Sequence, residues 1–135
     1  MQSLQGAQLA ANWLGNAKGV LQSAHDLALR IKQDIDNRNG KVSAQGQLAV
    51  TGTKDGEHAG GINNAGGQWL AGEGLTIAAR ALDNAQGGLL YSQKQQRLAL
   101  SDALNNRDGK VQSGEALQLD AQTLNNAGGT IDGQQ

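Results

Sequence analysis

Few side chains in this 135-residue chain could take part in catalysis or metal binding, because it contains no Cys and only two His. The densest charged group is formed by Lys54, Asp55, Glu57 and His58, which could contact a ligand, a receptor or a metal ion. Loops carried on a rigid scaffold often hold binding residues. However, one His and two carboxylates without a second His or Cys make a poor metal site. The sequence therefore predicts no bound metal or cofactor, and we interpret the segment 51–61 as a tolerated loop insertion with a direct contact as the alternative.

A second group of candidate contact residues lies in the segment 90–97, which is three residues longer than the corresponding parts of the chain. Tyr91, Lys94 and Arg97 could form a small recognition site, since Tyr and Arg are common anchors of protein interfaces. A bulged strand whose charges are solvated explains the same residues without a ligand, and this is the interpretation we adopt.

The composition limits the elements that could position these residues. The chain has 20 Gly, no Pro, no Phe and only three aromatic residues, whereas aromatic side chains supply much of a compact core. A hydrophobic content of 38% with a net charge of −1 is equally unlike a disordered chain. The low charge predicts no nucleic-acid partner, and no apolar run reaches the roughly 20 residues that cross a bilayer, so no membrane insertion is expected. An elongated repeat fits, because each unit buries only a thin slice of core.

A repeat is present along the whole chain. Its signature is Asn-x-x-Gly, preceded by an aliphatic residue two positions before the Asn and followed by an apolar residue two positions after the Gly. The six pairs are Asn16 and Gly19, Asn37 and Gly40, Asn64 and Gly67, Asn84 and Gly87, Asn106 and Gly109, and Asn126 and Gly129. The apolar residues after the Gly are Leu21, Val42, Trp69, Leu89, Val111 and Ile131. Apolar positions separated by two residues indicate strands with one buried face.

Short strands that repeat about every 20 residues predict an all-β protein, a parallel β-helix of about six coils. We expect one elongated domain over residues 1–135, with coils at roughly 9–26, 27–47, 48–74, 75–97, 98–116 and 117–135. The motif Gly is expected at a corner that requires positive φ, and the stacked Asn side chains are expected to form a hydrogen-bonded ladder. Trp69 is expected in the lumen and Trp13 is expected to fill the end of a coil, with a role as stacking platforms as the alternative for both.

The segments 98–113 and 117–131, with their Leu-x-Leu pairs and Leu-x-Asn-x-x-Gly-x-Val motifs, resemble filamentous haemagglutinin repeats. The resemblance covers residues 9–133 and implies a right-handed parallel β-helix. It also implies secretion to the bacterial outer cell surface through an outer-membrane β-barrel transporter of the two-partner type. Filamentous haemagglutinin adhesins and contact-dependent growth inhibition exoproteins are the main members of the family.

On this basis the chain is expected to be a fragment of a longer protein. Its expected role is a structural shaft that presents a distal binding or toxic element to a host-cell or target-bacterium receptor or glycan. The alternative is a β-helix domain that binds or cleaves polysaccharides. Cleavage is disfavoured, because glycosidases use paired carboxylates about 5–10 Å apart, whereas Asp36 and Asp83 are expected two coils apart with an amide between them. We therefore expect no enzymatic activity.

Overall fold

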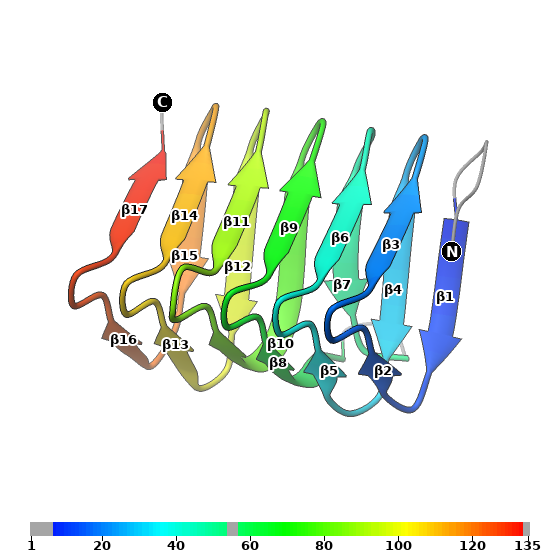
Figure 1. Ribbon diagram of the computed structural model, residues 1–135, viewed down its shortest axis with the longest axis horizontal. Helices are drawn as coiled ribbons and strands as arrows, with labels where there is room; N and C mark the ends of the chain where they lie inside the picture. The colour runs from blue at the N-terminus through cyan, green and yellow to red at the C-terminus, as the bar shows by residue number, and fades with distance from the viewer. Residues whose placement is uncertain (1–6, 54–56, 134–135) are drawn as a thin grey trace.

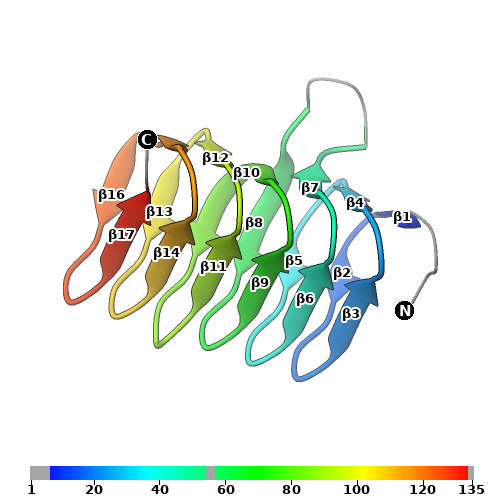
Figure 2. The same ribbon diagram turned by 90° about the horizontal axis from the view of Figure 1, so that it is seen from above.

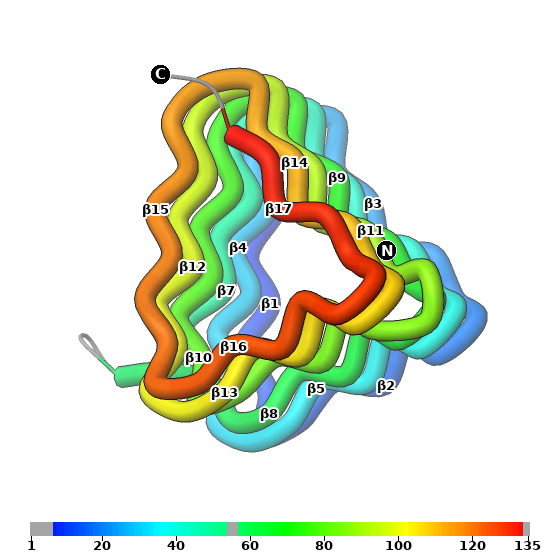
Figure 3. The backbone as a smooth tube through the Cα atoms, turned by 90° about the vertical axis from the view of Figure 1, so that its left-hand side faces the viewer, coloured from blue at the N-terminus to red at the C-terminus, as the bar shows by residue number. Residues whose placement is uncertain are grey.

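The computed structural model describes residues 7–53 and 57–133, and within these ranges every regular element is a β-strand. The strands form a β-solenoid of six coils with a three-sided cross-section (Figures 1 and 3). In Figure 3, where the C-terminal coil is nearest the viewer, the chain runs counter-clockwise as it approaches, so the solenoid is right-handed. The predicted fold class is therefore confirmed.

Each side of the solenoid is a stack of parallel strands, seen side by side in Figure 2. The first side consists of β1 (Ala7–Ala11), β4 (Leu27–Ile31), β7 (Leu48–Thr51), the first part of β10 (Leu75–Asp83), β12 (Gln96–Leu100) and β15 (Leu117–Asp120). The second side consists of β2 (Leu14–Gly15), β5 (Ile35–Asp36), β8 (Ala59–Asn63), the last part of β10, β13 (Ala103–Asn105) and β16 (Thr123–Asn125). The third side consists of β3 (Val20–Ser23), β6 (Lys41–Ala44), β9 (Gln68–Ala71), β11 (Leu89–Ser92), β14 (Lys110–Ser113) and β17 (Thr130–Gly133).

The lumen is filled by apolar side chains, aliphatic except for Trp69, that are stacked in register between coils. On the first side Leu29, Val50, Ile77 and Leu98 are aligned, on the second side Ile35, Ile62, Leu82 and Leu104, and on the third side Val42, Trp69, Leu90 and Val111. All twelve are at most 2% exposed. Alternation along each strand sends these residues inward and polar residues outward, because successive side chains point to opposite faces. The lumen position predicted for Trp69 is confirmed.

Two coils begin earlier than the sequence predicts. Coil five begins at Gln96, which pairs with Leu75, and Ala7, the first described residue, already pairs with Leu27. The prediction placed the start of coil five at Leu98 because Gln96 is polar where other coils have an aliphatic residue. Consequently the corner between β11 and β12 has the same length as the other corners of its type, and the bulge expected in the segment 90–97 is absent.

Gln96 is a buried polar residue in an apolar stack. Its side chain is 1% exposed, and Nε2 donates to the Gln112 carbonyl oxygen at 2.8 Å. Its Oε1 has no hydrogen-bond partner among the described residues. A buried acceptor without a partner costs about 1–3 kcal/mol, which exceeds the roughly 1 kcal/mol that one hydrogen bond contributes.

We therefore expect Gln96→Leu to raise the free energy of unfolding by about 1 kcal/mol. Leucine is already present at the paired positions Leu75 and Leu117. Urea unfolding followed by circular dichroism measures the change. Gln118→Leu, on the same strand stack but exposed, is the matched control and should shift stability by less than about 0.5 kcal/mol. A lower midpoint for Gln96→Leu would show that the bond to Gln112 outweighs the unpaired oxygen.

Candidate functional site

The motif asparagines form the hydrogen-bonded ladder that the sequence predicts. Each Nδ2 donates to the Oδ1 of the motif asparagine in the next coil, at 2.7–2.8 Å, from Asn16 through Asn126. The same Nδ2 atoms also donate to a backbone carbonyl of the following coil, as Asn84 does to Lys110 at 2.9 Å. The four inner side chains are 0% exposed. The ladder therefore ties every described coil to the next at one corner.

The expected conformation of the motif glycine is wrong for five of the six coils. Positive φ falls on the residue before that glycine, and in four coils this residue is not glycine. The residues with this conformation are Lys18, Asn39, Gly66, Gln86, Asp108 and Gly128, with φ between 56° and 69°. The motif glycine is needed instead for close approach. A Cβ added at Gly109 would lie less than 3.0 Å from the backbone carbonyl oxygen of Asn84, in the preceding coil.

In coil four the corner glycine is Gly88, not Gly87 as predicted. Gly87 has a φ of 84° and open space where a Cβ would lie, so it is one extra residue in the turn. A Cβ at Gly88 would clash with Asn64 and Asn84 as at the other corners. As a result Leu90, rather than Leu89, is the lumen residue of this coil. When Gly88 is aligned with the corner glycines of the other coils, the repeat pattern is restored. The apolar lumen residue then stands two positions after the glycine, and an outward residue and a small residue follow it.

A row of Asp and Asn residues lies on the outer face of the second side, immediately before the motif asparagines. The row is Gly15, Asp36, Asn63, Asp83, Asn105 and Asn125. In the last five, the side-chain Oδ1 accepts the backbone N–H two residues later, at 3.1–3.2 Å. These bonds are Asx-turns, which stabilise the start of each corner. Asp36 and Asp83 thus have a structural role that the sequence analysis missed.

Asp36 also forms an ion pair with Arg38. The Arg38 Nε donates to Oδ1 at 2.9 Å and Nη2 donates to Oδ2 at 2.8 Å. These hydrogen bonds to the charged form lower the pKa of the Asp36 carboxyl. A carboxylate held in this state is a poor general acid, which needs a raised pKa.

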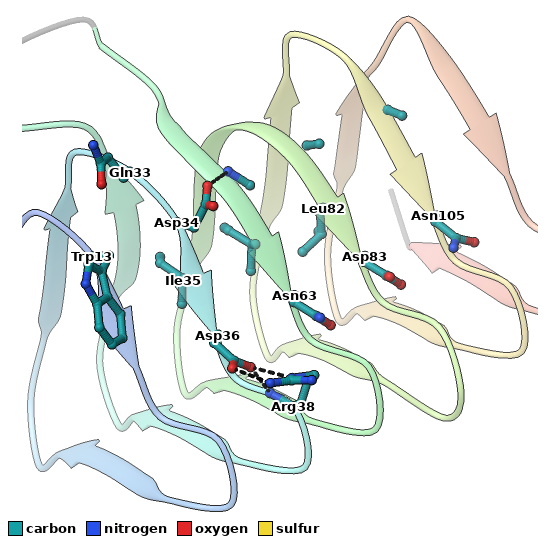
Figure 4. Close-up of a pocket in the computed structure, with 14 residues that line it drawn as sticks. Trp13, Gln33, Asp34, Ile35, Asp36, Arg38, Asn63, Leu82, Asp83 and Asn105 are labelled. Atoms are coloured by element: carbon teal, nitrogen blue, oxygen red, sulfur yellow. Dashed lines mark hydrogen bonds and ion pairs between the residues drawn. The ribbon is translucent and has the colours of Figure 1, made fainter.

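A groove of about 600 Å³ runs along the second side and crosses coils one to five. Figure 4 shows Trp13 near one end, with Asp36, Asn63, Asp83 and Asn105 following one another along the coils. The Trp13 side chain is 63% exposed, so the expectation that it fills the end of a coil is wrong.

The predicted contact residues that the structure describes do not all come together in one place. Lys54 and Asp55 lie outside the described residues, whereas Glu57 and His58 are exposed where the chain returns to the wall at β8. The neck of this insertion is closed by the Gly52 N–H, which donates to the Glu57 carbonyl at 2.9 Å. Arg30 also donates to the Thr53 carbonyl at 3.0 Å.

The second group is divided between two sides of the solenoid. Tyr91 lies on the third side between Leu70 and Gln112, Arg97 lies on the first side, and Lys94 lies at the corner between them. Because Tyr91 and Arg97 lie on different sides of the solenoid, their placement does not favour contact of both with one small ligand.

The described part of the chain holds no group of three or more His, Asp and Glu residues that could bind a metal ion. Within the same residues there is no helix long and apolar enough to cross a membrane.

The fold and the ladder define a repeat protein whose units are coils of a β-solenoid. The family model described as the haemagglutinin repeat matches residues 2–108 and 91–135. The chain belongs to the haemagglutinin repeat family. Neither the curated proteins nor the solved structures gave a match.

Proposed function

We propose that the chain is a segment of the shaft of a secreted bacterial surface exoprotein, of the adhesin or contact-dependent growth inhibition type. Its role is to extend and present a distal binding or toxic element. The observation that carries the proposal is the asparagine ladder, which runs through all six coils without a break. Uniform coupling between coils gives stiffness, and the number of coils sets the reach, at about 4.8 Å per coil.

Membership of the haemagglutinin repeat family supports the cell-surface setting. The proposed partners are an outer-membrane transporter of the two-partner secretion type, which would act through a separate secretion domain, and a receptor or glycan on another cell. We propose no enzymatic activity, because each carboxylate of the second-side row is engaged in a turn and Asp36 is also paired with Arg38.

Two measurements on bacteria that produce the parent protein test this role. Antibodies raised against the purified chain should label the outer surface of intact cells, and protease added outside should remove the label. Label confined to the cytoplasm would refute the proposal.

A one-coil deletion tests the spacer role directly. Removal of residues 89–109 joins Gly88 to Lys110, which follows the equivalent corner glycine, so the shortened solenoid keeps its register. We expect the parent protein to remain on the surface and its distal element to remain active. Removal of residues 89–98 is the matched control; it takes out about half a coil and should prevent folding beyond the deletion. Loss of distal activity in a displayed one-coil deletion would contradict a spacer role.

A further inference from the structure

The second-side groove has features that a spacer does not require. It combines an exposed aromatic ring with a row of polar side chains repeated once per coil. We propose that this groove binds an extended, uncharged polysaccharide, with its chain axis along the solenoid and Trp13 as the stacking surface. This inference is independent of the shaft role, since either can hold without the other.

Trp13 is placed for stacking by its surroundings. Its ring lies over Gly15, where a Cβ would come within 2.6 Å of Trp13 Cζ3. Gly15 is the one member of the second-side row that is neither Asp nor Asn, so the ring takes the space that a row side chain occupies in other coils. An exposed tryptophan is unusual in a chain with three aromatic residues. Aromatic rings that combine an apolar face with a polar tip suit ligands that have both apolar and polar surfaces, as sugars do.

The polar row offers one hydrogen-bonding group per coil. Asn63, Asp83 and Asn105 use Oδ1 in their turns. Their second polar atoms, Nδ2 or Oδ2, have no hydrogen-bond partner within the described residues and point outward along the row in Figure 4. The amide nitrogens can donate and the carboxylate oxygen can accept, as sugar hydroxyls require. Because coils repeat about every 4.8 Å, the row fits a ligand that is itself a repeating chain of similar period.

The floor and the charge of the groove narrow the class of ligand. Gly61, Ala81 and Ala103 line it in a row of small residues beside the polar row, and the Arg80 guanidinium lies over Gly61. A flat sugar ring can therefore lie close to the backbone at Ala81 and Ala103. Asp34 and Asp83 form no ion pair with a described residue, whereas Asp36 is neutralised by Arg38. The groove is therefore negative overall and disfavours polyanions. Coils one to five span about 19 Å at the strand spacing, which accommodates several sugar units.

Titration calorimetry with cellohexaose, chitohexaose and hexagalacturonate tests the proposal. We expect at least one of the two uncharged hexasaccharides to bind with a millimolar or lower Kd, and hexagalacturonate not to bind. Trp13→Ala should weaken that binding about tenfold, equivalent to about 1.4 kcal/mol, because it removes the stacking surface. Val20→Ala is the matched control; Val20 is 58% exposed but lies on the third side.

A second variant separates the polar row from the ring. Asn63→Ser keeps an oxygen that can cap the turn and removes the outward amide donor without adding a charge, so binding should weaken several-fold with little change in the melting temperature. The proposal is overturned if neither uncharged hexasaccharide binds at millimolar concentration, if hexagalacturonate binds as well as they do, or if Trp13→Ala leaves the affinity unchanged.

Discussion

Replacing Asn84 with alanine is expected to lower the free energy of unfolding by about 4 kcal/mol, because three buried polar groups lose partners at about 1–3 kcal/mol each. The three groups are Asn64 Nδ2, Asn106 Oδ1 and the Lys110 carbonyl oxygen, all bonded to the Asn84 side chain at 2.7–2.9 Å. Asn84 is 0% exposed and belongs to coil four, so water cannot replace the lost bonds.

The loss should be largest in the coils next to the substitution, because each coil of a solenoid is stabilised by its neighbours. Urea unfolding gives the global change, and amide hydrogen exchange reports which coils lose protection. Asn126→Ala is the matched control at the same motif position. Its side chain is exposed and accepts only one ladder bond, from Asn106 at 2.7 Å, so about 1 kcal/mol is expected. Equal midpoints for Asn84→Ala and the unmodified protein would rule out the ladder as a source of stability.

Replacing Gly109 with alanine is expected to lower the free energy of unfolding by about 3 kcal/mol, as overpacking against rigid neighbours does. The added methyl group would meet the Asn84 backbone carbonyl and Asn106 Oδ1, and neither can move without separating coils four and five. Gly109 is not among the residues with positive φ. Backbone entropy alone would therefore make alanine stabilising by about 0.4–1 kcal/mol. Crowding at the corner and the lower backbone entropy of the unfolded chain thus change the free energy of unfolding in opposite directions.

Thermal and urea unfolding measure the sign of the net change. Gly87→Asn is the matched control, because Gly87 has a φ of 84° and open space around a Cβ, and Asn tolerates this conformation. We expect it to change stability by less than about 1 kcal/mol. A stabilised Gly109→Ala variant would contradict the close approach of the preceding coil as the reason for the corner glycine.

The local sequence determines most of the architecture. Apolar residues two positions apart predict strands with one inward face. The six copies of Asn-x-x-Gly predict one motif corner in each coil and identify the ladder residues. Both signals depend only on the periodicity of a strand and on stacking of equal positions. For this reason the fold class and the asparagine ladder could be predicted without any knowledge of contacts between coils.

The register of individual coils was harder to predict, because pairing is decided by the neighbouring coil. Gln96 is aligned with Leu75 and Leu117 of the neighbouring coils, and this pairing places it at the start of its strand. Its own segment suggests that the strand begins later, because Gln96 is polar. Likewise, Gly87 and Gly88 are equivalent as residues in the sequence. They differ in backbone conformation, since φ is positive only at Gly87, and in the close approach of the backbone of coil three to Gly88.

The candidate site depended most on the tertiary structure. Sequence analysis drew attention to charged segments, whereas the groove is lined by Trp13 and an Asp and Asn row that come together only when five coils stack. The sequence alone determined the repeating strand, the corner and the ladder, since these follow from the period within one unit. Only the tertiary structure decided which glycine is crowded, where each coil begins and which outer face forms a groove, because these depend on distances between units that the chain brings together by stacking.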